Sequence, residues 1–174
     1  LGEFVIQRLI IDFNGFIEDT GVVGITGCYD DKNEIIADGG SLRSMLTGFT
    51  WGLRTNKRIA SPHFNRKYNK SYKVDEVANA FMIPRKIFED VGGFDEENFP
   101  IDLDEADICR RIKNMGYRIV MNPLAVCYHA SQTYSYLPNF RRRLNAYTMG
   151  NHRIRYQRKH LNALSYWVFV IVFC

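Results

Sequence analysis

The chain has 174 residues, 46% hydrophobic and 24% charged, so it is long enough to bury the core of one domain and does not belong to the disordered class. Its net charge of +4 conceals an uneven distribution. Residues 1–107 hold 12 Lys/Arg and all 19 Asp/Glu, whereas residues 108–174 hold 11 Lys/Arg and no acid. This polarity predicts that one part faces a metal ion or another cationic ligand and that the other faces an anionic partner. The four cysteines are far apart and lack zinc-like spacing, which favours a reduced, intracellular chain.

The first part of the chain predicts one helix and two strands. Apolar residues recur at helical spacing over residues 4–13, and residues 21–29 are β-branched and bounded by turn formers. Residues 34–37 begin a second, short strand. Residues 41–72 show no regular pattern, and the basic stretch over 57–73 is expected to be a surface loop or a mobile flap.

The pattern becomes sharper from residue 74 onward. Residues 74–83 predict a strand, and residues 84–91 predict a helix that ends at Gly92 and Gly93, because glycine adopts the left-handed conformation of a helix end. A second helix is predicted over residues 104–115, with Gly116 capping its C-terminus.

Two short strands, 117–121 and 125–129, are predicted on either side of Asn122. A basic helix over 137–160 and an apolar run over 161–174 follow. Alternating strands and helices predict a mixed α/β fold.

Four carboxylates lie within six residues at the start of the helix over 104–115: Asp102, Asp104, Glu105 and Asp107. Helix capping is one explanation, because acids favour helix N-termini and Asp104 with Asp107 has the spacing of a capping box. Capping does not explain all four, since crowded carboxylates repel one another unless a cation or an unusual protonation state relieves them. A functional acid cluster and capping therefore both stay open. A calcium loop of the EF-hand type is excluded because its required glycine is absent.

Two other positions stand out from their surroundings. Asn79 and Ala80 interrupt a strand pattern, and a small residue there allows either a close approach of a ligand to the backbone or tight strand packing. His129 ends the apolar run 124–128 and is either a structural residue or a ligand.

Residues 77–96 resemble the family 2 glycosyltransferases of the GT-A fold, in which a small-residue strand is followed by a basic pair, a helix and a turn similar to Gly-Gly-Phe-Asp-Glu. Residues 99–109 resemble the acidic motif of that family, and the segments that follow, up to His129, keep the family's order and spacing. The resemblance is strong over residues 74–135 and loose over residues 1–73.

The resemblance implies a partial GT-A-like mixed sheet with flanking helices. It also implies that the acidic motif supplies the general base that deprotonates the acceptor hydroxyl, with inversion at the sugar. By strict alignment Glu105 takes the base position, and Asp104 takes it if the turn shifts, because Asp104-Glu105 stands where the family has Glu-Asp. Asp107 matches the family's second aspartate and is interpreted as partly capping and partly organising the site. Asn79 and Ala80 would border the donor sugar.

His129 matches a position that in some GT-A enzymes helps to bind the divalent metal or the donor diphosphate. The family's Asp-x-Asp motif, whose Mg²⁺ or Mn²⁺ bridges the diphosphate, has no counterpart in this sequence. Asp12, Asp30 and Asp31 are interpreted as surface acids. We therefore expect the nucleotide-binding half to precede Leu1, and we expect this piece alone not to transfer sugar.

The C-terminal part combines basic and apolar residues. Seven Lys/Arg between residues 141 and 159 lead into the apolar run 161–174, with Tyr166 and Trp167 near its start. This pattern is typical of a cytoplasmic interface that enters a membrane, and a buried C-terminal helix is the alternative. No recognition motif accompanies the basic residues, so nucleic acid is not an expected partner.

These inferences give three expected parts: residues 1–136 as the acceptor-side part of a GT-A catalytic domain, 137–160 as a basic juxtamembrane helix, and 161–174 as the start of a transmembrane helix. The expected function is inverting transfer of a hexose-type sugar from a nucleotide-sugar to a lipid-linked or polysaccharide acceptor. We expect a divalent metal, Mg²⁺ or Mn²⁺, and a location at the cytoplasmic face of the cell membrane.

Two other functions stay open. The swapped order of Asp104 and Glu105 leaves room for a non-catalytic relative that binds glycans or organises a complex. The basic and apolar C-terminal part leaves room for a peripheral membrane-binding domain whose acids serve only as helix caps.

Overall fold

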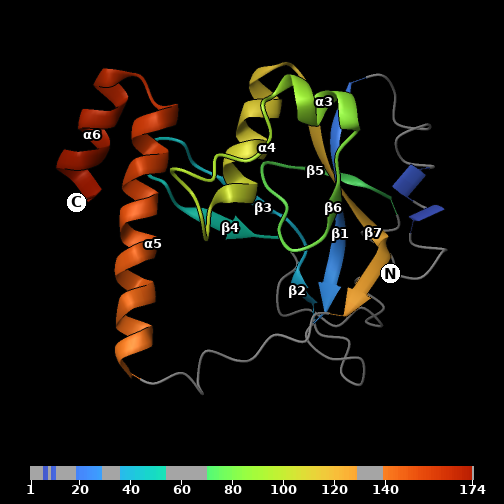
Figure 1. The fold of residues 1–174 in the computed structure, drawn as a ribbon, viewed down its shortest axis with the longest axis horizontal. Coiled ribbons are helices and arrows are strands. Elements are labelled where there is room, and N and C mark those ends of the chain that lie inside the picture. Colours follow the sequence, from blue (N-terminus) through green and yellow to red (C-terminus); the bar gives the residue numbers. More distant parts are fainter. Residues whose placement is uncertain are drawn as a thin grey trace.

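The computed structural model describes most of the chain: residues 6–7, 9–10, 19–28, 36–53, 70–128 and 139–173. Within these residues five strands form one mixed sheet, two more strands form a separate hairpin, and helices flank the sheet (Figure 1). The predicted α/β fold with a mixed sheet and flanking helices is confirmed.

The sheet is built on two long parallel strands, β1 (Thr20–Cys28) and β7 (Arg118–Tyr128). β2 (Ile36–Asp38) and β6 (Phe81–Met82) pair antiparallel with β1, and β5 (Tyr72–Val74) pairs antiparallel with β7. β1 and β7 therefore form the centre of the sheet.

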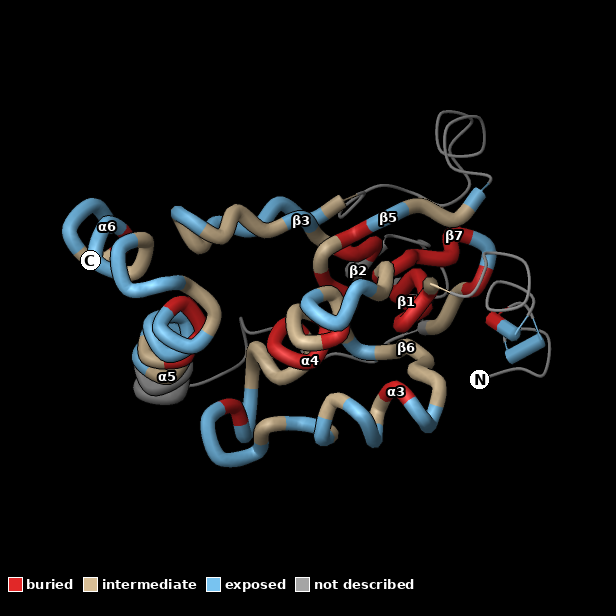
Figure 2. Tube along the Cα trace, turned by 90° about the horizontal axis from the view of Figure 1, so that it is seen from above, coloured by how far each residue is buried: buried red, intermediate tan, exposed pale blue. Residues whose placement is uncertain are grey.

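The core lies on both faces of β1, which is why this strand is apolar rather than alternating in polarity. Val22 points to one face and packs with α4 (Asp104–Asn114). Val23 and Ile25 point to the other face and pack with Leu9, which belongs to the helical residues of the first expected helix. Figure 2 shows buried residues concentrated on β1, β7 and α4, with exposed residues towards the outer helices.

β7 is one continuous strand, so the prediction of two short strands around Asn122 was wrong. The Asn122 Oδ1 atom accepts hydrogen bonds from the backbone N–H groups of Leu124 and Ala125 at 2.8 and 3.0 Å. This local turn shifts the register against β1, and pairing resumes at Val126. The proline region therefore forms a bulge within the strand instead of ending it.

The predicted strand over residues 74–83 is divided, because the chain bends over residues 75–80 between β5 and β6. Asn79 has a left-handed backbone with φ of 63°. The Ala80 carbonyl accepts a hydrogen bond of 2.9 Å from the backbone N–H of Ile25, so the bend is attached to β1.

A short antiparallel hairpin of β3 (Ser41–Arg43) and β4 (Thr50–Gly52) occupies the region in which the sequence showed no pattern. An ion pair between Arg43 and Glu76, with both side chains almost fully buried, attaches this hairpin to the bend. The expected surface loop over 57–73 lies mostly outside the described residues.

The helices from residue 85 onward follow the predicted pattern, whereas the expected helix over residues 4–13 lies mostly outside the described residues. α3 (Arg85–Asp90) ends at Gly92 with φ of 82°, and α4 ends at Gly116 with φ of 96°. α5 (Asn139–His160) corresponds to the predicted basic helix, and α6 (Ala163–Phe173) turns back beside the second half of α5 (Figure 1). None of the helices in the described residues combines the length and the apolar character that a membrane span requires.

Two glycine substitutions test the packing and should have opposite effects. A Cβ atom on Gly24 would lie 2.4 Å from Val77 and 2.6 Å from Met121, so Gly24→Ala should lower the free energy of unfolding by about 1–3 kcal/mol. Gly150 lies in α5, and a Cβ atom added there would have nothing within 4 Å, so Gly150→Ala should raise it by about 0.5–1 kcal/mol. Urea denaturation measures both, and a loss of stability in both variants would contradict this packing.

Candidate functional site

The carboxylate of Asp107 is fully buried in the first turns of α4 and binds three basic side chains. Arg111 donates to its Oδ2 atom at 2.7 Å, and Lys159 and His160 at the end of α5 lie 2.7 Å from Oδ1. Burial by itself raises the pKa of Asp107, but hydrogen bonds from His160, Lys159 and Arg111 outweigh burial and lower that pKa below its ordinary value. Asp107 therefore joins α4 to α5 as a buried anion.

The same ion-pair network reaches the loop between α3 and α4. Arg111 donates to the backbone carbonyls of Val91 and Gly93, each at 2.7 Å. Lys159 also binds Asp95 at 2.6 Å. Burial raises the pKa of Asp95, yet hydrogen bonds headed by the one from Lys159 hold this pKa at about 2. The Gly-Gly-Phe-Asp turn is thus fastened to both helices.

Glu105 is in a very different environment, although it precedes Asp107 by only two positions. It is half-buried and has no ion-pair partner within the described part of the chain. Its Oε1 atom accepts a long hydrogen bond, 3.4 Å, from the backbone N–H of Asn79. Burial, together with a hydrogen bond to Asp104 and the charge of that neighbour, raises the pKa of Glu105 to about 7. The pair can therefore hold or release a proton near neutral pH.

Backbone strain is concentrated around this acid pair. In the part of the chain that the structure describes, the non-glycine residues with positive φ are Asn79 (63°), Asp102 (65°) and Leu103 (63°). Each such conformation costs about 1–3 kcal/mol and persists where the surrounding structure enforces it, often at functional sites. Leu103 precedes the first turn of α4 and no side chain caps the helix there, so the capping box of Asp104 and Asp107, one of the two explanations for the acid cluster, is not formed.

The structure brings together three of the residues that the sequence singled out: Asp104, Glu105 and Asn79. Ala80 adjoins them, but its backbone carbonyl is bound to β1. Asp107 binds α5 rather than the acid pair, so it organises the site only through α4. His129 lies outside the described residues.

The described residues contain no group of three or more His, Cys, Asp or Glu side chains placed to hold a metal ion. The carboxylate of Asp107 already binds three basic side chains, so Asp104 and Glu105 are the carboxylates of α4 that could meet a metal. The divalent metal stays a prediction.

Sequence reasoning missed the basic residues that bind these acids, above all Lys159 and His160. Their signal was the charge distribution, in which an acid-rich stretch over 95–107 is followed by an acid-free basic one over 139–160. That asymmetry predicted two external partners. The structure shows instead that some of the acids pair with basic side chains of the same chain.

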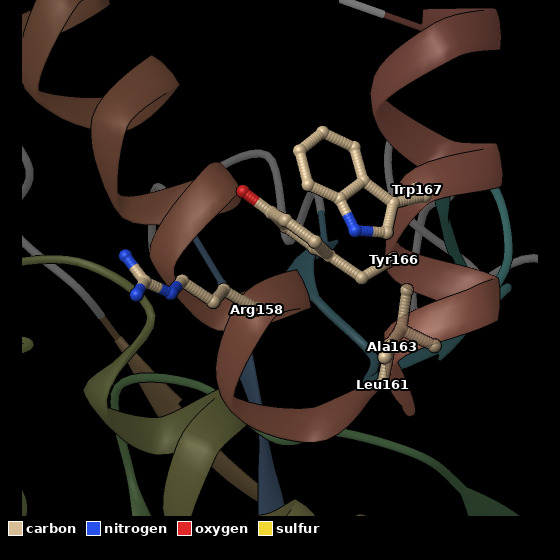
Figure 3. A pocket seen from close by; sticks show the side chains of 5 residues that line it. All are labelled: Arg158, Leu161, Ala163, Tyr166 and Trp167. Carbon is tan, nitrogen blue, oxygen red and sulfur yellow. The ribbon is translucent and has the colours of Figure 1, made fainter.

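A pocket with a volume of about 540 Å³ lies where α5 passes into α6. Figure 3 shows Arg158 of α5 and the rings of Tyr166 and Trp167 of α6 around it. The two ring centroids are 5.9 Å apart. The acid pair is not part of this pocket.

Comparison with known proteins adds little to this geometry. No family model matches the chain. The uncharacterized protein y4gI of Sinorhizobium fredii is 35% identical over 52 residues, which are 30% of this chain and 6% of that protein. The chain thus corresponds to a small share of that relative's length, and the relative's name states no activity.

Removal of the buried carboxylate tests the link between α4 and α5. Asp107→Asn removes the carboxylate that pairs with Arg111, one of the two carboxylates that bind Lys159, and the acceptor that faces His160, so the free energy of unfolding should fall by about 3–5 kcal/mol. The exposed Arg85–Glu89 pair provides the control, since Glu89→Gln should cost at most about 0.5 kcal/mol. Similar small losses in both variants, measured by urea denaturation, would show that Asp107 does not hold the helices together.

Titration tests the environment of Glu105. Carbon NMR should show its carboxyl titrating near pH 7 rather than at its ordinary value of 4.5, and Asp104→Asn should move the midpoint down because it removes a negative neighbour. The folded protein keeps a proton that the unfolded chain releases, so this group makes the free energy of unfolding fall as pH rises from about 4.5 to 7. Glu105→Gln should abolish that contribution, and an unshifted midpoint in the wild type would refute the assignment.

Proposed function

We propose that the protein is an inverting glycosyltransferase, similar to family 2 and with a GT-A-like fold, in which Glu105 is the general base. The observation that carries the proposal is the Asp104–Glu105 pair, whose partly buried glutamate has a pKa raised to about 7 beside strained backbone. The order of motifs over residues 74–135 and the mixed sheet are consistent with such a fold.

The chemistry needs a proton acceptor whose pKa lies near the working pH. Ionised Glu105 takes the proton of the acceptor hydroxyl while that oxygen forms a bond to the anomeric carbon. The bond from that carbon to the donor diphosphate breaks on the opposite face, and its electron pair leaves with the diphosphate. The nearby negative charge of Asp104 makes Glu105 a stronger base.

The neighbouring residues have positioning roles in this proposal. The backbone N–H of Asn79 orients the Glu105 carboxylate, and Asn79 with Ala80 borders the donor sugar. Asp107 is a positioning residue, because its contacts with α5 fix the helix that carries the base. His129 is proposed to meet the metal or diphosphate. A divalent metal, when bound, supplies positive charge to the leaving diphosphate.

The remaining parts of the proposal concern the donor and the membrane. The nucleotide-binding half and the main metal ligands are proposed to precede Leu1. The basic α5 and the apolar α6 are proposed to meet the cytoplasmic face of the cell membrane, where a lipid-linked or polysaccharide acceptor is glycosylated.

Sugar transfer by the complete gene product in its membranes tests the proposal, with a panel of nucleotide-sugars and with Mn²⁺ or chelator. The rate should rise with pH and level off above about 7, because the base acts only when ionised. Glu105→Gln should lower kcat by about 10²–10⁴-fold, and Asp104→Asn should move the pH midpoint down. Glu97→Gln, at an exposed acid of the preceding loop, is the matched control.

Unchanged turnover and pH profile in Glu105→Gln would remove Glu105 as the base. The opposite outcome is a protein that binds sugar without turning over any donor, although it is folded, membrane-bound and supplied with acceptor. That result would replace the proposed enzyme function by that of a non-catalytic, glycan-binding relative.

A further inference from the structure

A cavity of about 410 Å³ lies between the β3–β4 hairpin, α5 and α6, and none of its lining residues belongs to the acid pair. Three phenylalanine rings form its apolar wall. Phe173 lies edge-on to Phe49 and stacks with Phe169, with ring centroids 6.0 Å apart in both pairs. Phe49 and Phe173 are 58% and 40% exposed, so much of this aromatic surface is open to a ligand.

One polar side chain in the lining is buried and incompletely hydrogen-bonded. Gln157 is 1% exposed, and its Nε2 atom donates to the backbone carbonyl of Met45 at 2.9 Å. That contact fixes the orientation of the amide, because a carbonyl oxygen can only accept. The Gln157 Oε1 atom then has no hydrogen-bond partner among the described residues. Buried acceptors normally have a hydrogen-bond partner, so the lack of one here indicates a ligand that donates a hydrogen bond.

The lining contains two arginines in different states. The guanidinium of Arg43 is bound to Glu76, contacts the Gly48 carbonyl at 3.3 Å and lies 4.6 Å from the centre of the Tyr156 ring. Arg153 is exposed and has no ion-pair partner in the part of the chain that the structure describes. The uncompensated charge of the cavity is therefore positive.

Arg153 lies one helical turn before Gln157, so both side chains are on the same face of α5. A ligand group at this place thus meets a cation and a hydrogen-bond acceptor together. A phosphate monoester satisfies both, because its anionic oxygens can accept from arginine while its remaining P–OH, with a pKa near 6, can donate. A phosphodiester offers the charge without the donor, and a plain alcohol offers the donor without the charge.

We propose that this cavity binds a single-chain anionic amphiphile with a phosphate monoester head. The chain lies on Phe49, Phe169 and Phe173, the anionic oxygens face Arg153, and the P–OH donates to Gln157. This site does not depend on the proposed sugar transfer, and its ligand is recognised equally as a free molecule or as a lipid headgroup.

The first test is calorimetric titration of the full chain with decyl phosphate below its micelle concentration. Arg153→Ala should weaken binding at least about tenfold. Arg155→Ala, at an exposed arginine of the same helix that does not line the cavity, should leave it within about twofold. Equal losses in the two variants, or no binding by the wild type, would overturn the proposal.

The second test separates charge from hydrogen bonding. At about pH 5, below the second pKa near 6, both phosphate esters carry one negative charge and only the monoester keeps a P–OH. Under these conditions the wild type should prefer decyl phosphate to methyl decyl phosphate, which has no donor, and should prefer either to 1-decanol. Gln157→Met should remove the first preference and keep the second. Retention of both preferences in a folded Gln157→Met protein would contradict the role of Oε1.

A blocking variant keeps the proposal falsifiable if Gln157 variants fold poorly. Gly150 lines the cavity, and a Cβ atom added there would have nothing within 4 Å, so the bulky side chain of Gly150→Trp should obstruct the cavity. Binding of decyl phosphate should be lost while circular dichroism and the melting temperature are retained. Wild-type affinity in this variant would overturn the proposal.

Vesicles identify the source of the ligand. Binding to phosphatidylcholine vesicles with phosphatidic acid, but not to those with equally charged phosphatidylglycerol, supports a lipid headgroup if Arg153→Ala abolishes it. Binding of soluble decyl phosphate alone supports a free amphiphile.

Discussion

The buried carboxylate of Asp107 is the contact on which the arrangement of the helices depends. A carboxylate out of reach of water is unfavourable unless cations and hydrogen bonds replace its hydration, and here three basic groups do so. Two of those groups belong to the last turn of α5, so the ion pairs fix α5 against the start of α4. Because successive residues of a helix are about 100° apart, Glu105 then points to nearly the opposite side, where it meets Asn79.

Asp107 and Glu105 therefore have opposite pKa shifts although they share one helical turn. The cations of this region bind Asp107 and Asp95, and hydrogen bonds from them lower the pKa of both groups despite burial. Glu105 is partly buried beside the negative Asp104 and binds no cation among the described residues, so its pKa is raised. Divergent pKa values in adjacent carboxyls are the usual way in which a protein separates a structural anion from a group that exchanges protons.

The features that sequence predicted well are those with local causes. Helix ends at Gly92 and Gly116 follow from left-handed backbone that glycine tolerates, and the acid cluster follows from spacing alone. The errors concern pairing between distant residues. β7 continues through Asn122 because β1 runs beside it, and strand 74–83 breaks because its middle residues turn away from the sheet. The division of roles among the acids depends on side chains more than 50 residues away.

The position of Asn79 shows how far the candidate site depends on such distant contacts. Its bend is held at one end by the Ala80 carbonyl, which is bonded to β1. At the other end Glu76 is paired with Arg43 of the hairpin, and Asp75 is paired with Lys113 of α4. With both ends fixed, the strained left-handed conformation persists and its N–H stays directed at Glu105. The geometry around the proposed base thus rests on a three-residue hairpin strand, an element too short for its sequence pattern to reveal.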